Sequence, residues 1–201
     1  MIFPEAIQHL DEQLFILINT RMANAVFDTV LPPIRDKLFW IPLYIVIAGI
    51  LVYRFKLKGL WMVLLIVANF AASDQISSAV IKPAVGRLRP CNEPSFQSEV
   101  ILRIDACGGG KSFTSSHATN TFAFAVMLIL LFKKRLRWIT PVALLWAGSI
   151  SFAQVYVGVH YPFDILAGAL LGTLISIILF NIAQRWFHLI PLDAGAPSNS
   201  I

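Results

Sequence analysis

Charged residues are scarce in this chain of 201 residues: Asp, Glu, Lys and Arg make up 13% of it, whereas 57% of the residues are hydrophobic. A soluble domain usually carries about 25% charged residues and a smaller apolar fraction. The scarcity of charge therefore excludes an ordinary soluble domain and predicts a membrane protein. The chain also lacks internal repeats and low-complexity tracts. We expect one domain over residues 1–201, with a flexible tail at 192–201.

The first 37 residues lack the long uncharged run of about 20 residues that a membrane crossing requires. Charged side chains recur along them: Glu5, Asp11, Glu12, Arg21, Asp28, Arg35, Asp36 and Lys37. Ile7, Leu10, Leu14 and Leu17 instead recur at helical spacing, with Asp11 on another face. Residues 1–37 are therefore predicted to form amphipathic helices in the membrane interface, the second of which stops at Pro32-Pro33. No Lys or Arg occurs in the first ten residues, so a cleavable signal peptide is not expected.

Five apolar stretches farther along the chain are long enough to cross a membrane. They span residues 38–53, 59–81, 118–132, 138–157 and 163–184. Short basic connections follow the first and the third stretch, and such connections stay in the cytoplasm. The expected fold is all-α, a polytopic membrane bundle of about five transmembrane helices with the N-terminal interfacial helices beside it. Residues 83–117 then form an active-site loop on the outer face, and the net charge of +5 reflects membrane orientation instead of nucleic-acid binding.

Residues that suit an oxyanion occur at the outer ends of the predicted crossings. They are, in chain order, Lys82, Arg89 with Pro90, Ser115, Ser116, His117, His160 and Asp164. Folding the helices into a bundle brings these clusters to one pocket. Two cations, two imidazoles, hydroxyl groups, a carboxylate and the free N–H groups at a helix start can together bind and transfer a phosphoryl group.

The spacing of these residues resembles the three signature motifs of the type 2 phosphatidic acid phosphatase superfamily, whose members share their phosphate pocket with vanadium haloperoxidases. The motifs read Lys82-x6-Arg89-Pro90, Ser115-x-His117 and His160-x3-Asp164. The resemblance implies that His160 attacks phosphorus, that Asp164 holds its other ring nitrogen, and that His117 protonates the leaving oxygen and then activates water. It also implies a set of phosphate ligands and no metal or other cofactor. These ligands are Lys82, Arg89, Ser115 and Ser116.

The chain departs from the family pattern at Ala153-Gln154, where the family has Ser-Arg before the nucleophile. Gln154 can still donate hydrogen bonds to phosphate, but it supplies no charge. We expect Arg87 or Lys111, from the outer loop, to supply the missing cation. The alternative is a weakened or repurposed site.

The two cysteines, Cys91 and Cys107, both fall within the outer loop. The space outside a bacterial inner membrane is oxidising. A disulfide is therefore expected, closing a loop of about 15 residues and worth on the order of 3 kcal/mol.

These expectations together predict a bacterial inner-membrane enzyme whose active site faces the periplasm and hydrolyses a phosphomonoester or diphosphate of a membrane lipid. Candidate substrates are lipid A, undecaprenyl diphosphate, phosphatidic acid and phosphatidylglycerophosphate, and the long bridged loop favours the large head groups of the first two. Two alternatives stay open. One is a phosphotransferase in which a hydroxyl group captures the phosphohistidine, and the other is a non-catalytic carrier of lipids or anions. The expected partners are the lipid substrate and the bilayer.

Overall fold

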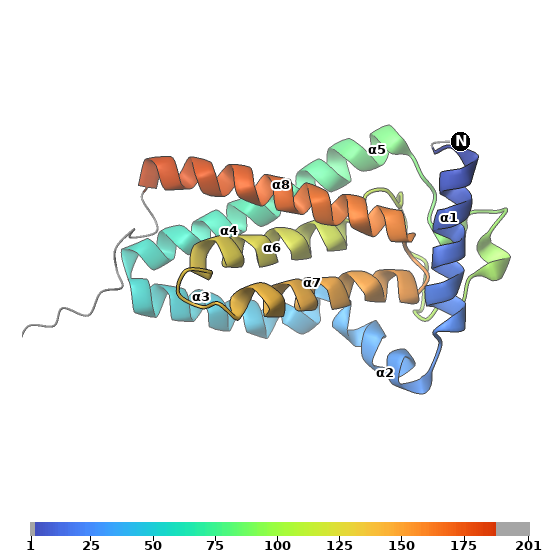
Figure 1. Ribbon diagram of the computed structural model, residues 1–201, viewed down its shortest axis with the longest axis horizontal. Helices are drawn as coiled ribbons and strands as arrows, with labels where there is room; N and C mark the ends of the chain where they lie inside the picture. Colours follow the sequence, from blue (N-terminus) through green and yellow to red (C-terminus); the bar gives the residue numbers. More distant parts are fainter. Residues whose placement is uncertain (1–2, 188–201) are drawn as a thin grey trace, which may run out of the picture.

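The computed structural model describes residues 3–187, and most of them lie in helices that run side by side (Figure 1). The bundle consists of α3 (Ile41–Phe55), α4 (Leu57–Gln75), α6 (Ser116–Phe132), α7 (Ile139–Tyr156) and α8 (Pro162–Phe187). The predicted tail at 192–201 lies outside the described residues.

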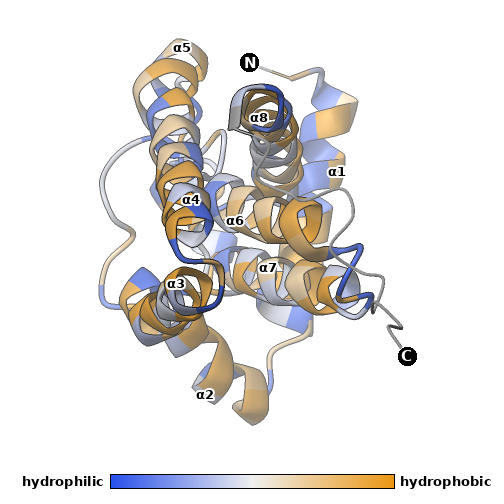
Figure 2. Ribbon diagram, turned by 90° about the vertical axis from the view of Figure 1, so that its left-hand side faces the viewer, coloured by the Kyte–Doolittle hydropathy of each residue, from blue (hydrophilic) through white to orange (hydrophobic). Residues whose placement is uncertain are grey.

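Four helical stretches of the described chain are long and apolar enough to cross a membrane. They are Lys37–Phe55, Leu57–Asn92, Ile139–Tyr156 and Pro162–Trp186. Helix α6 is shorter, with 17 residues, but at about 26 Å it still matches most of a bilayer core. Apolar side chains such as Leu145 (73% exposed) and Leu170 (67%) lie on the outside of the bundle. Hydrophobic residues predominate along most of the bundle helices (Figure 2). An exposed apolar surface of this extent suits lipid, so the all-α membrane bundle predicted from the sequence is confirmed.

Helix α6 lies at the centre of the bundle and packs closely against α8. A Cβ atom on Gly172 of α8 would lie 2.1 Å from the carbonyl oxygen of Thr119, so only glycine lets the two backbones approach this far. A buried polar cluster joins a third helix to this pair, because Asn69 of α4 and Ser176 of α8 both donate to the carbonyl oxygen of Ala123, at 2.9 Å each. This packing fixes the start of α6 relative to the start of α8.

Helix α4 continues beyond its regular part as a π-helical segment, η3 (Ile76–Ile81), and a last turn, α5 (Lys82–Val85). Gly86 then ends the helix in a left-handed conformation, with φ +68°. The predicted outer loop of residues 83–117 therefore begins inside this last turn. It passes through two 3-10 turns, η4 (Pro90–Asn92) and η5 (Gln97–Glu99), and ends in the first turn of α6.

The N-terminal segment crosses the end of the bundle and then turns back along it (Figure 1). Helix α1 (Glu5–Ile16) continues into a π-helical turn, η1 (Leu17–Arg21), and α2 (Ala25–Ile34) follows at an angle of 113°. The apolar stripe that includes Leu10 is exposed, as an interfacial helix requires. The polar face is not free, however, because Asp11 is fully buried, as are Phe15 and Asn19 at the following four-residue intervals.

The N-terminal helices differ from the sequence expectation at one further point. Helix α2 runs on to Ile34, so Pro32 and Pro33 lie in its last turn instead of stopping it. A short 3-10 helix, η2 (Lys37–Trp40), then leads directly into α3.

Candidate active site

The three sequence motifs meet at the end of the bundle that α1 crosses. His160 is buried in the turn between α7 and α8, Asp164 lies in the first turn of α8, and His117 is the second residue of α6. His117 lies within electrostatic range of His160, Lys82 and Arg89. Residues from three separate parts of the chain therefore share one site.

The turn that presents His160 depends on Gly158. This residue has φ +94°, a conformation that glycine adopts without strain. A Cβ atom there would also lie 2.9 Å from Cγ1 of Val100 and 3.1 Å from the carbonyl oxygen of Ile101, both on the outer loop. Glycine thus lets the loop close directly over the turn that carries His160.

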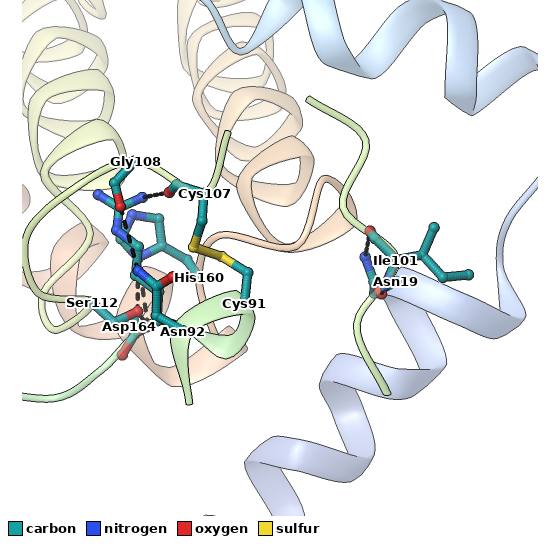
Figure 3. Close-up of a disulfide and its surroundings, with 10 residues drawn as sticks. Asn19, Cys91, Asn92, Ile101, Cys107, Gly108, Ser112, His160 and Asp164 are labelled. Carbon is teal, nitrogen blue, oxygen red and sulfur yellow. Dashed lines mark hydrogen bonds and ion pairs between the residues drawn. A yellow bond between two sulfur atoms is a disulfide. The ribbon is translucent and has the colours of Figure 1, made fainter. Parts of the chain in front are cut away.

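The ring of His160 is held on its Nδ1 side. Asp164 Oδ2 lies 3.5 Å from Nδ1, and the hydroxyl of Ser112 lies between them, 3.2 Å from Nδ1 and hydrogen-bonded to the same carboxylate oxygen (Figure 3). The backbone N–H of Tyr161 also donates to Oδ2, at 2.9 Å. These contacts favour the tautomer with a proton on Nδ1, which leaves the lone pair on Nε2. Burial lowers the pKa of His160 to about 4, although Asp164 opposes the shift, so the imidazole is neutral near pH 7.

Arg87 has a different place from the one expected of it. Its guanidinium bridges two buried carboxylates, with Nη1 2.7 Å from Asp164 Oδ1 and Nη2 2.7 Å from Asp11 Oδ2. The ring of Tyr161 lies beneath it, with its centroid 3.9 Å away. A guanidinium that is neutralised on both sides positions Asp164 and is not free for phosphate, which corrects the expectation for Arg87. Lys111 is partly exposed, and no hydrogen bond or ion pair within residues 3–187 directs it into the site.

Arg89 and Lys82 differ from Arg87 because neither forms an ion pair with a described carboxylate. Nη1 of Arg89 donates to the carbonyl oxygen of Cys107 at 3.3 Å, and its Nε is buried without a hydrogen-bond partner. Cys107 is in turn bonded to Cys91, with the two Cα atoms 5.9 Å apart (Figure 3). The disulfide therefore anchors the carbonyl group that holds Arg89. Partly buried cations without a counter-charge suit an anionic ligand.

The serine hydroxyls at the start of α6 already have partners. Ser115 is the N-cap and accepts from the N–H of Ala118 at 3.4 Å. Ser116 Oγ lies 3.0 Å from the hydroxyl of Ser77 and 2.9 Å from that of Ser78. The structure brings both predicted phosphate ligands next to His117, where the unpaired N–H groups of the first turn also lie.

Gln154 is fully buried on α7. Its Oε1 accepts a hydrogen bond of 3.3 Å from Nε of Arg35, the residue that follows α2. Its Nε2 is buried and has no partner among the described residues.

A cavity of about 180 Å³ opens beside His117, and Asp74 lies in its wall. It adjoins an apolar groove of about 490 Å³ between α3 and α4 that reaches Ala48. The two share Lys37, Tyr44 and Phe70 in their linings, so they lie next to each other. The cavity beside His117 thus has an apolar groove as its neighbour. Within residues 3–187 no group of three His, Cys, Asp or Glu side chains is arranged to hold a metal ion.

Sequence reasoning missed Asp11, Ser112 and Arg35. Ser112 contacts His160 and Asp164, and Arg35 contacts Gln154. Asp11 acts at one remove, because it binds Arg87, which in turn binds Asp164. Ser112 lies five residues before His117 and belongs to none of the motifs. Arg35 reaches its partner across 119 residues of sequence. Asp11 alone carried a signal, since it shares one helix face with Phe15 and Asn19 and could have been recognised as part of a buried face.

Comparison with known proteins gives consistent matches over most of the chain. The family model of the PAP2 superfamily matches residues 59–188. The chain is 32% identical over 195 residues to the lipid A 4'-phosphatase of Bacteroides thetaiotaomicron, which covers 96% of this chain and 85% of the relative. It is 25% identical over 202 residues to the lipid A 4'-phosphatase of Porphyromonas gingivalis, with coverages of 97% and 81%.

A solved structure has the same fold. The crystal structure of a transmembrane PAP2-type phosphatidylglycerolphosphate phosphatase from Bacillus subtilis matches with a TM-score of 0.69. The match covers 92% of this chain and 90% of that one, at 22% identity.

Proposed function

Since the chain belongs to the PAP2 superfamily and is a multi-pass membrane lipid phosphatase, we propose that it removes a phosphate group from lipid A through a phosphohistidine on His160. The observation that carries the mechanism is the buried imidazole of His160, which is held at Nδ1 by Asp164 and Ser112 beside cations that have no counter-charge. The choice of lipid A is supported by the likeness to two lipid A 4'-phosphatases over nearly the whole chain.

In the first step, Nε2 of His160 attacks phosphorus and the bond between phosphorus and the lipid oxygen breaks. His117 gives its proton to the departing oxygen, so the lipid leaves as an alcohol. The positive charge that develops on the imidazole ring is stabilised by Asp164, which Arg87 and the N–H of Tyr161 keep in place. Arg89, Lys82 and the first N–H groups of α6 stabilise the charge on the phosphoryl oxygens.

In the second step, a water molecule replaces the lipid alcohol. His117 takes a proton from the water, the water oxygen attacks phosphorus, and the bond between nitrogen and phosphorus breaks. His160 returns to its neutral form and inorganic phosphate leaves. The two histidines, the lipid and water supply every proton and every bonding pair. The two steps therefore return the enzyme to its starting state without a metal.

The groove between α3 and α4 supports a lipid as the substrate. It lies next to the cavity beside His117, so an acyl chain against Ala48 and Phe70 would lie close to the site that takes the phosphate. The basic connections after α3 and α6 lie at the opposite end of the bundle from the site (Figure 1). The positive-inside rule places that end in the cytoplasm, which supports an active site on the periplasmic face of a bacterial inner membrane.

The test is phosphate release by the purified protein in detergent with excess chelator, offered lipid A bisphosphate, undecaprenyl diphosphate and phosphatidic acid separately. We expect release from lipid A that falls by at least about 10³-fold in His160→Ala. His9→Ala is the matched control, because His9 is an exposed histidine on α1. Acid-labile, base-stable phosphate should also be trapped on the wild-type protein during turnover.

Three results would count against this function. Turnover in His160→Ala would exclude the nucleophile, and loss of activity with chelator would exclude a metal-independent reaction. Appearance of the phosphate on a lipid or sugar hydroxyl, with no free phosphate, would make the protein a phosphotransferase.

A further inference from the structure

The site has a charge deficit on α7, where Gln154 occupies a motif position that carries arginine in the family. Gln154 is completely buried. Only one end of its amide has a partner within the described residues, because Oε1 accepts from Arg35 while Nε2 is unpaired. An unpaired buried donor next to a cation can bind an oxyanion.

Arg35 comes from a part of the chain that no motif includes. It follows the last residue of α2 and lies in the wall of the 180 Å³ cavity, together with His117 and Ser116. Its charge acts on His117 and on Arg89. Arg35 therefore adds a positive charge to the place where the phosphoryl group is expected.

The guanidinium of Arg35 has free hydrogen-bonding capacity. Its Nε donates to Gln154 at 3.3 Å, and it forms no ion pair with a described carboxylate. Burial lowers the pKa of Arg35, an effect that the neighbouring Asp36 opposes, but a guanidinium remains protonated in proteins. Its two Nη groups are thus charged donors available to a ligand.

We propose that Arg35 and Gln154 together form the third phosphate-binding arm of this enzyme. Arg35 supplies the charge and its two Nη groups, while Gln154 fixes the guanidinium through Oε1 and offers its own Nε2 to a phosphoryl oxygen. The proposal rests on the function proposed above, since it assumes that a phosphoryl group occupies the site. Arg35 also lies outside residues 59–188, the part that matches the family model. In this chain the third phosphate-binding cation would therefore come from the N-terminal segment instead of the motif.

The two loop residues expected to fill this role are less suitable. Arg87 is neutralised by Asp11 and Asp164. Lys111 is partly exposed and has no described contact with a residue of the site. Arg35 is the candidate that contacts position 154 itself.

The experiment moves the charge back to α7. Arg35→Gln keeps a donor for Gln154 but removes the charge, and the double variant Arg35→Gln/Gln154→Arg restores it at the motif position. Arg21→Gln is the matched control, since Arg21 is an exposed arginine of the same N-terminal segment. Orthovanadate affinity is measured by titration calorimetry, and kcat/KM is measured on the lipid that the wild type hydrolyses.

We expect Arg35→Gln to weaken orthovanadate binding at least tenfold and to lower kcat/KM by about 10²- to 10³-fold, the usual cost of one lost oxyanion contact. The double variant should recover at least about tenfold of that kcat/KM loss. Arg35 with a purely structural role would give a lower melting temperature and no rescue by arginine at 154.

The inference is overturned if Arg35→Gln stays within about threefold of the wild type in both measurements. It is also overturned if the folded double variant is no better than Arg35→Gln. Should Arg35→Gln fail to fold, Arg35→Lys decides, because lysine keeps the charge but lacks the two Nη donors and the Nε that Gln154 fixes. We expect orthovanadate binding to weaken by more than about threefold, and binding within about threefold of the wild type in the folded variant refutes the proposal.

The two proposals fail in different ways. If His160→Ala still turns over the lipid, or the wild type does not bind orthovanadate, the proposed function is wrong and the inference falls with it. If His160→Ala is inactive while Arg35→Gln behaves like the wild type, only the third arm is wrong.

Discussion

Asp11 on α1 is predicted to hold the catalytic end of the bundle together, and Asp11→Asn tests this. Its carboxylate is fully buried and accepts from Arg87 Nη2 at 2.7 Å and from the backbone N–H of Phe163 at 2.9 Å. Because both partners are donors, the asparagine amide must turn its NH₂ group towards one of them. The variant therefore loses one charge-assisted hydrogen bond and gains a contact between two donors.

The expected cost follows from what remains of the network. Removing one partner of a buried ion pair typically costs about 3–5 kcal/mol. Here Asp164 continues to neutralise Arg87, and asparagine keeps one acceptor, so we expect about 2–3 kcal/mol, the value of a hydrogen bond to a charged group. For a chain of this length, that corresponds to a melting temperature lower by roughly 5–10 °C.

The assay is thermal unfolding in detergent, combined with kcat and KM on the lipid substrate. We expect kcat to fall about ten- to a hundredfold, because Arg87 is released on one side and Asp164 shifts relative to His160, while KM changes little. Glu12→Gln is the control: it alters the next residue, which accepts from Gln8 at 2.9 Å and keeps that acceptor. Melting of Asp11→Asn within 2 °C of the wild type, with unchanged kcat, would refute the reasoning.

Three other expectations can be checked separately. Lowering the pH from about 6.5 to about 4 should destabilise the fold by on the order of 3 kcal/mol. Over that interval His160 becomes protonated in the unfolded chain but stays neutral in the folded protein, where its pKa is lowered to about 4. His160→Gln should flatten this part of the curve of melting temperature against pH. Replacing Cys91 and Cys107 by serine should cost about 3 kcal/mol, from the 16-residue separation, and should also lower kcat/KM because Arg89 loses its anchored carbonyl; an unchanged melting temperature would contradict this. Ala48→Trp should raise KM for a long-chain lipid about tenfold by filling the groove, with orthovanadate binding unchanged, whereas Val46→Trp on the exposed side of α3 should leave KM as it is.

The bundle could be predicted from the sequence because lipid imposes a simple rule on composition. Each predicted crossing corresponds to a helix, and the boundaries differ by only a few residues: the span expected at 118–132 is α6, Ser116–Phe132. The extension of α4 to Val85 was harder to predict, since hydropathy does not distinguish the π-helical segment Ile76–Ile81 from an α-helix. The N-terminal segment was harder still, because an amphipathic pattern shows which side is apolar but does not say what covers the polar side.

The site could be predicted as far as the motifs reach. Lys82, Arg89, His117 and His160 come together because each stands at or near a helix end, where sequence spacing determines position. The contacts of Asp11 and Arg35 run over 76 and 119 residues of sequence, and no local pattern encodes such a pairing. A single sequence shows that Gln154 lacks a charge, but only the folded chain shows which residue lies against it.

Arg87 and Arg35 show why an arginine cannot be assigned a role from its place in the sequence. Arg87 lies between Lys82 and Arg89 in the sequence, yet it binds two carboxylates, which neutralise its charge. Arg35 lies outside every motif, yet it meets an uncharged amide and keeps its charge for a ligand. What separates them is the charge of the partner: a buried guanidinium between two carboxylates is neutralised within the protein, whereas one held by a neutral acceptor keeps its charge for an anionic ligand. By the same criterion Arg89, which is held by the carbonyl oxygen of Cys107, belongs with Arg35, and the phosphoryl group is expected to lie between the two.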